Sequence, residues 1–160
     1  MRVFDASSII SAWDNYPIEQ FPGLWDWMAK QAQSSQIALP KVAFEEVKHK
    51  TPACADWLKT NSIELIEPDN EIIQDALRIK DRLGIAEDGY HPKGVDENDL
   101  LIIATAVIHS GELVSDESRQ PKQPNEPRKM KIPLVCALSD VDVLCLNFVE
   151  FLKDSGHVFR

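Results

Sequence analysis

Four acidic residues stand at positions from which a folded chain could bring them together. Asp5 follows a short apolar run at the start of the chain, and Glu46 lies in an amphipathic stretch. Asp99 opens a strongly apolar stretch, and Glu117 follows the short segment 112–115, which is predicted to be a strand. Carboxylates gathered at one place repel one another unless a cation neutralises them. Oxygen ligands without Cys or His favour Mg²⁺ or Mn²⁺ over zinc, so the four acids predict a metal-dependent site.

Two of these acids also have purely structural interpretations. Asp5 could cap the helix that follows it, although a carboxylate at the end of a buried strand is costly without a partner. Glu46 competes with its neighbour Glu45 for a place on the inner flank of its helix. Two serines beside the acids, Ser7 and Ser115, could supply hydroxyl contacts to a metal, water or phosphate, or could equally cap backbone groups.

The other two acids carry similar alternatives. Asp99 stands three residues after Asp96, the predicted N-cap, and the helix dipole favours an acid in this first turn. Glu117 has an acidic neighbour, Asp116, which is a possible substitute as metal ligand. Either of this last pair could instead be a solvated loop residue.

The charge balance restricts the classes of function. The chain has 160 residues, with 26 acidic and 17 basic side chains, and a formal net charge of -9. This charge argues against a protein that coats nucleic acid by bulk electrostatics, but clustered carboxylates are compatible with a metal-dependent enzyme acting on phosphates. Segment 119–131 is locally basic and could guide a substrate strand, or could be a solvated loop. Its basic residues are Arg119, Lys122, Arg128, Lys129 and Lys131, and Lys41 or Lys48 could lie on the opposite side.

The sequence also predicts a cytoplasmic protein that does not cross a membrane. The charge of Asp5 comes too early for the apolar region of a secretory signal, and the apolar-rich run 100–108 is about half a membrane span. The three cysteines, Cys54, Cys136 and Cys145, are an odd number without C-x-x-C spacing. This usage favours reduced, buried thiols over a disulfide framework or a zinc site.

The hydrophobic pattern predicts alternating strands and helices. Such alternation favours parallel βαβ units in a three-layer α/β/α sandwich, with a central, mainly parallel five-stranded sheet in a single domain over residues 1–160. Ligands of such sheets bind beyond the carboxyl ends of the strands, where the four acids would converge. The predicted strands are 2–5, 37–39, 63–66, 112–115 and 132–136, and the predicted helices are 9–13, 21–33, 42–50, 53–60, 70–83, 97–109 and 140–154. Two loops are expected, a flap at 84–95 and the basic segment 119–131.

Four motifs in order carry a family resemblance: residues 3–8 (VFDASS), 42–47 (VAFEEV), 98–106 (NDLLIIATA) and 113–117 (LVSDE). Together they resemble a PIN domain, the fold shared by VapC-type toxin ribonucleases and related nucleases. Residues 16–17, 21–25 and 131–136 are similar to a bacterial PIN-like subfamily of uncharacterised function.

The resemblance implies both a site and an activity. Asp5, Glu46 and Asp99 match three acids of the family site, and Glu117 stands where the family commonly has Asp or Asn. The implied activity is Mg²⁺- or Mn²⁺-dependent hydrolysis of RNA phosphodiester bonds by the toxin of a type II toxin-antitoxin system. The implied partners are RNA, a cognate antitoxin that could insert an Arg among the carboxylates, and a second copy in a homodimer.

Two other functions remain compatible with the residues. A PIN-like domain could serve as a catalytically weak binding or scaffold module in a regulatory complex, and the Glu at position 117 and the acidic charge are the reasons to retain this alternative. An acid-phosphatase-like transfer with Asp5 as nucleophile fits less well. That chemistry usually needs a second Asp two residues on, where this chain has Ser7.

Overall fold

A single parallel sheet forms the centre of the protein. The structure is a computed structural model that describes residues 1–160. The strand order is β3-β2-β1-β4-β5, and every neighbouring pair is parallel, which confirms the expected sheet. Val3 pairs with Ala38 on one side and with Leu113 on the other. The strands are β1 (Arg2–Phe4), β2 (Ile37–Pro40), β3 (Glu64–Ile66), β4 (Glu112–Val114) and β5 (Leu144–Leu146).

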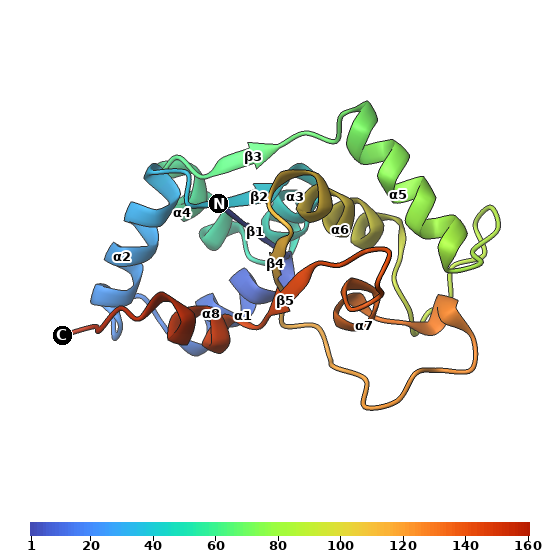
Figure 1. Cartoon of the computed structure of the whole chain (residues 1–160). Helices are drawn as coiled ribbons and strands as arrows, with labels where there is room; N and C mark the ends of the chain where they lie inside the picture. The colour runs from blue at the N-terminus through green and yellow to red at the C-terminus, as the bar shows by residue number, and fades with distance from the viewer.

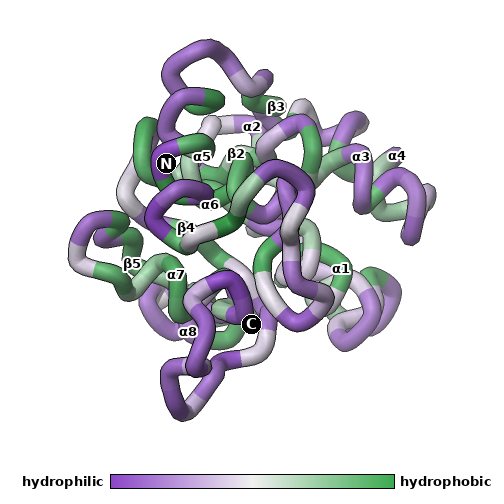
Figure 2. The backbone as a smooth tube through the Cα atoms, turned by 90° about the vertical axis from the view of Figure 1, so that its right-hand side faces the viewer, coloured by the Kyte–Doolittle hydropathy of each residue, from purple (hydrophilic) through white to green (hydrophobic).

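Helices lie on both sides of this sheet (Figure 1). All four residues of β2 are buried, as expected for a parallel strand covered on both faces. Hydrophobic residues gather along the strands, whereas the outer turns are hydrophilic (Figure 2). None of the helices combines the length and the apolar character needed to cross a membrane. The helices are α1 (Ala6–Asn15), α2 (Pro22–Gln33), α3 (Lys41–Lys50), α4 (Pro52–Thr60), α5 (Asn70–Arg82), α6 (Glu97–His109), α7 (Ile132–Cys136) and α8 (Phe148–Ser155), with a 3₁₀ helix at Pro127–Lys129.

Two predicted elements near the C-terminus were wrong. Residues 132–136 form the helix α7 and not the fifth strand, because a short apolar run does not distinguish strand from helix and Pro133 fits the first turn of a helix. The predicted helix 140–154 is divided into the strand β5 and the shorter helix α8. Asn147 caps α8 together with Glu150 in a capping box, which fixes the start of this helix after the strand.

The direction of the connections changes between β1 and β4. From β1 the chain continues to β2 and β3 on one side, whereas β4 continues to β5 on the other. Such a switch point leaves a crevice at the carboxyl ends of the two central strands. The residues that leave these strands are Asp5 and Ser115, and the Asp5 N–H donates to the Val114 carbonyl at 2.8 Å. The topology therefore brings two of the predicted site motifs into direct contact.

Candidate functional site

Asp5 directs its carboxylate into the site and does not use it to cap a helix. It occupies the N-cap position of α1, but its side chain makes no capping hydrogen bond. Its Oδ2 accepts from Ser7 Oγ at 2.6 Å and from Ser115 Oγ at 2.9 Å, and no protein group donates to Oδ1. The one fully buried side-chain polar atom without a partner is Oδ2 of Asp75, so Oδ1 of Asp5 has access to solvent. One oxygen is thus held in place by hydroxyls and the other is available to a ligand.

The surroundings of Asp5 oppose its negative charge. Burial raises the pKa of Asp5 to about 6, against the opposing effect of the two serine hydroxyls, and the charges of Glu117 and Glu46 raise it further. The residue is only 2% exposed. A buried carboxylate surrounded by other carboxylates is unfavourable without a cation. The ionised form of Asp5 is therefore a strong candidate to bind one.

Asp99 shares this environment from the first turn of α6. It completes a capping box, because its N–H donates to Asp96 Oδ1 at 2.8 Å and its Oδ2 accepts from the Asp96 N–H at 3.1 Å. The pKa of Asp99 is raised to about 8. Burial is the largest cause, and the negative charges of Asp96, Asp5 and Glu117 also raise it. One oxygen of Asp99 therefore has the structural role expected in the first turn of a helix. The same carboxylate also lies within electrostatic reach of the other acids.

Glu46 contributes to the site from α3 together with a lysine. Glu46 is half-buried, whereas Glu45 is exposed and has its carboxylate 3.9 Å from Lys41 Nζ. Lys50 Nζ donates to Glu46 Oε1 at 2.8 Å. The pKa of Lys50 is raised first by Glu46 and also by the charges of Glu117 and Asp5, so this ammonium group pairs with Glu46 and lies within electrostatic reach of the other two acids.

Lys50 was absent from the predicted site. The signal that could have found it is its spacing of four residues from Glu46, because residues i and i+4 are neighbours on one helix face. Of the two lysines predicted instead, Lys41 lies near Glu45 and Glu67, and Lys48 is exposed and forms no ion pair.

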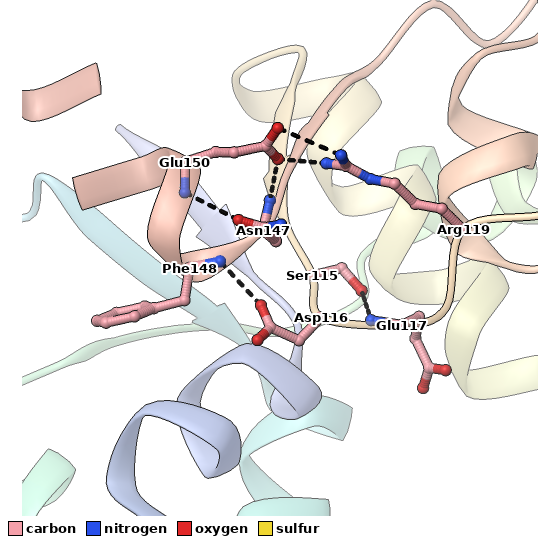
Figure 3. Close-up of polar contacts among 7 residues, drawn as sticks. All are labelled: Ser115, Asp116, Glu117, Arg119, Asn147, Phe148 and Glu150. Atoms are coloured by element: carbon pink, nitrogen blue, oxygen red, sulfur yellow. Dashed lines mark hydrogen bonds and ion pairs between the residues drawn. The ribbon is translucent and has the colours of Figure 1, made fainter. Parts of the chain in front are cut away.

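Asp116 and Glu117 point in different directions (Figure 3). The Asp116 N–H donates to Ser7 Oγ at 3.0 Å, and its Oδ1 accepts from the Phe148 N–H at 2.8 Å, so this carboxylate holds the N-terminus of α8. The Glu117 N–H donates to Ser115 Oγ at 3.2 Å, and its carboxylate points away from α8. Glu117 is the one of this pair whose charge raises the pKa of Asp5.

Three of the five basic residues in segment 119–131 form ion pairs with carboxylates. Arg119 forms a bidentate pair with Glu150 on α8 (Figure 3), and this pairing lowers the pKa of Glu150. Arg128 lies 3.5 Å and Lys129 3.2 Å from carboxylate oxygens of Glu126. The remaining two basic residues of this segment, Lys122 and Lys131, form no ion pair.

The predicted flap is packed against this basic segment. The Val95 N–H donates to the Met130 carbonyl at 3.0 Å, and Arg128 donates to the Gly89 carbonyl at 3.3 Å. Gly94 lies so close to the Arg128 backbone that an added Cβ would be 1.9 Å from its carbonyl oxygen. The absence of a side chain at Gly94 therefore permits the two loops to pack together.

The donor set fits a hard divalent cation in chemistry and charge. No three His, Cys, Asp or Glu side chains are arranged so that they could together hold a metal ion. Mg²⁺, however, commonly uses one or two carboxylates and completes its shell with water and phosphate oxygens. The free Oδ1 of Asp5 and the crowded acids around it match that requirement. The largest cavity, about 590 Å³ around Arg2, Trp27 and Glu112, is not lined by these acids.

Comparison with known proteins places the chain in a family and assigns its fold. Residues 3–159 match the family model described as Domain of unknown function (DUF4411). The chain belongs to this family. No curated protein sequence matches this DUF4411 chain. It is similar in structure to a chain of VapBC2 from Rickettsia felis, solved bound to a DNA fragment from their promoter. The TM-score is 0.51 at 17% identity, over 81% of the DUF4411 chain and 96% of the other chain.

This likeness confirms the PIN-like α/β fold that the motifs predict. At 17% identity it applies to the fold alone. The roles of the individual acids in the DUF4411 chain depend on the geometry described above and on the proposals below.

Proposed function

We propose that this protein is a Mg²⁺- or Mn²⁺-dependent endoribonuclease that hydrolyses phosphodiester bonds. The observation that supports it is the convergence of Asp5, Glu46, Asp99 and Glu117 at the switch point of the sheet, where their charges act on one another. Most of these acids are held by local hydrogen bonds, and the shared environment lacks enough positive charge to balance them. The position beyond the strand ends is the one at which parallel α/β sheets bind their ligands.

The acids have different roles in this proposal. Asp5, Asp99 and Glu117 would hold the cation, and Glu46 would either join them or orient the attacking water. The divalent cation supplies Lewis-acid stabilisation of the charge that develops on the phosphate. Ser7 and Ser115 orient Asp5 through its Oδ2 and leave its Oδ1 free for the cation.

Positive charge beside the acids would guide the RNA strand. Lys50 is well placed for this role, because its ammonium group lies 2.8 Å from Glu46 and is exposed to solvent. Within the basic segment, Lys122 and Lys131 are available as they stand, whereas Arg119, Arg128 and Lys129 would have to exchange a carboxylate for a phosphate.

The biological role that we propose is the toxin of a type II toxin-antitoxin system. One structural neighbour is VapBC2 from Rickettsia felis, solved bound to a DNA fragment from their promoter. By analogy, a cognate antitoxin would cover the acidic site of this chain and could insert an Arg among the carboxylates. A homodimer in the cytoplasm is part of the same proposal.

A catalytically weak binding or scaffold module is the alternative. The observation that favours it is the absence of three potential metal ligands already gathered around one point. One oxygen of Glu46 is engaged by Lys50 and one oxygen of Asp99 by the Asp96 N–H, which leaves each of them a single oxygen for a metal.

RNA cleavage by the purified chain distinguishes these two functions. We would incubate a panel of structured RNAs with the wild type, Asp5→Asn and Asp99→Asn in Mg²⁺ and in EDTA, with Asp56→Asn as a control on the exposed surface of α4. The nuclease proposal expects cleavage by the wild type and the control that EDTA abolishes, and loss of cleavage in both site variants. Equal cleavage by the site variants would refute the assigned site.

Metal binding gives an independent measurement. A formed carboxylate site raises the thermal midpoint of the wild type in Mn²⁺ and raises that of Asp5→Asn much less. Wild-type protein that gains no stability from Mn²⁺ and cleaves no RNA would support the scaffold module.

A further inference from the structure

The basic segment 119–131, which connects β4 to α7 (Figure 1), is closed at its base by one side chain. Gln120 Nε2 donates to the Lys129 carbonyl at 2.9 Å, and Gln120 Oε1 accepts from the Lys131 N–H at 2.8 Å. A single amide thus joins the beginning of the segment to its last three residues. Because both polar atoms of the amide are used, the contact fixes the two ends of the segment relative to each other.

Residues 129–131, the bridging segment, are bound on two sides. Met130 at their centre has an extended backbone, and the polar groups of successive residues in an extended chain point to opposite sides. The groups of its two neighbours accordingly bind the Gln120 amide, whereas the Met130 carbonyl accepts from the Val95 N–H at 3.0 Å. The bridging segment therefore lies between the Gln120 side chain and the backbone of the flap.

The contact with the flap leads directly to one of the site acids. Val95 is completely buried and immediately precedes Asp96, the N-cap of α6. Asp96 forms the capping box with Asp99. The position of Val95 therefore sets the place at which α6 begins and at which Asp99 lies.

The other end of this connection is the loop that carries Glu117. Gln120 follows Glu117 by three residues in the chain. Between them, Arg119 is anchored to α8 by its bidentate pair with Glu150, which limits the movement of this loop. The Gln120 amide thus joins two parts of the chain that each carry a site acid.

We infer that Gln120 is a positioning residue of the candidate site, because its amide holds the bridging segment and thereby the place at which α6 begins. Asp99 is thus kept in a fixed position relative to the loop that carries Glu117. The inference rests on the proposed function, in which both acids hold the cation. Gln120 acts through the backbone, as contacts outside the ligand shell do when they orient a metal ligand.

Amide hydrogen exchange of the full-length, metal-free protein tests the structural part of this inference. We would compare the wild type with Gln120→Met, which preserves the length of the side chain and removes its amide. Gln123→Met, at an exposed position in the same segment, is the matched control. Exchange is measured residue by residue by NMR.

The expected result is a local change that reaches the site. In Gln120→Met, exchange should become about 10-fold faster at Lys131, Val95 and Asp99, the size expected when hydrogen bonds that oppose local opening are lost. Exchange at Val114 in β4 should stay unchanged, as should all of these amides in the control. Faster exchange at Lys131 alone, or an equal change at Val114, would overturn the inference.

Mn²⁺ affinity tests whether this contact serves the site. Measured by calorimetry, the dissociation constant for Mn²⁺ should rise by about 10-fold in Gln120→Met, since loss of an outer contact weakens metal binding by about 10–100-fold. It should stay unchanged in the control. Equal Mn²⁺ affinity of Gln120→Met and the wild type would refute the positioning role alone. A wild type that binds no Mn²⁺ would refute the proposed function, and the role of Gln120 with it.

The wild type by itself provides a test that does not depend on the folding of a variant. Exchange measured at increasing, sub-denaturing urea concentrations should give Lys131 and Val95 the same free energy of opening, because both amides depend on the bridging segment. A lower free energy of opening at Lys131 than at Val95 would show that the Gln120 contact opens on its own and would overturn the inference.

Discussion

Two charged regions differ in how far their side chains are paired with opposite charges. One is the cluster of acids at the carboxyl edge of the sheet, and the other is the basic segment 119–131. Burial and like charges raise the pKa values of Asp5 and Asp99, and one lysine, Lys50, lies beside the acids. In the basic segment, by contrast, Glu126 pairs with two cations, and the pairing lowers the pKa of Glu126. The candidate site therefore gathers acids that share a single lysine, whereas three of the five cations in the basic segment already have a carboxylate partner.

The largest effect should come from Asp5→Asn. We expect RNA cleavage to fall by about 100-fold or more, since even outer-shell changes at metal sites cost about 10–100-fold. The same change should raise the free energy of unfolding of the metal-free protein at pH 8 by up to about 3 kcal/mol, because it removes a buried charge. Cleavage assays and urea denaturation measure the two effects. A variant that loses activity and stability together would indicate misfolding and would not support the comparison.

Lys50→Met tests the one cation beside the acids. We expect cleavage to fall by about 10-fold, because a partner of a metal-binding carboxylate is lost together with a contact to phosphate. Lys48→Met, two residues away on the exposed face of the same helix, is the matched control. If both variants cleave RNA equally well, Lys50 has no role in the site.

The stability of the metal-free protein should fall as the pH rises. In the folded protein the pKa of Asp5 is about 6 and that of Asp99 about 8, both above the usual value of 3.8. Between the usual value and these raised values, the folded state binds more protons than the unfolded state. This contribution to stability is complete below the lower value and is lost as the pH rises through the upper ones. Thermal midpoints between pH 4 and 8 should fall less steeply in the double variant Asp5→Asn, Asp99→Asn.

Mn²⁺ should reverse this trend. A cation that binds the ionised acids stabilises the folded state more at pH 8, where the site is deprotonated, than at pH 5. The same increase in thermal midpoint at both pH values would place Mn²⁺ binding outside these acids.

Asp116→Ala should affect stability more than cleavage. Its carboxylate accepts from the Phe148 N–H, and the loss of such a contact at a helix N-terminus costs about 1 kcal/mol. Urea denaturation measures this loss, and the cleavage rate of the folded variant should stay close to that of the wild type. A loss of cleavage as large as in Asp5→Asn would show that Asp116, and not Glu117, serves the site.

The smallest effect should come from the triple variant Arg128→Ala, Lys129→Ala, Lys131→Ala. Because Glu126 already pairs with two of these residues, we expect RNA affinity to fall slightly and the salt dependence to decrease by about one phosphate contact. Binding measured across a range of salt concentrations gives the slope. A decrease by about three contacts would mean that the whole segment binds RNA and that its ion pairs are exchanged on binding.

The fold class and the order of the elements as far as β4 could be predicted from the sequence. Alternating apolar runs predict the parallel sheet, and the position of Asp5 after the first strand indicates the edge at which a site would lie. The elements from residue 132 onward could not be assigned in this way, because the run 132–136 has no decisive period and the capping box at Asn147 was not recognised.

The sequence alone determined which residue types are available and in which order they follow the strands. Only the tertiary structure decided which charges are compensated, because a pair such as Arg119 and Glu150 joins residues far apart in the chain. It likewise separated the adjacent acids Asp116 and Glu117, sending one to α8 and the other toward Asp5. Burial and through-space distance set the energy of a charge, and neither is a property of a residue's position along the chain.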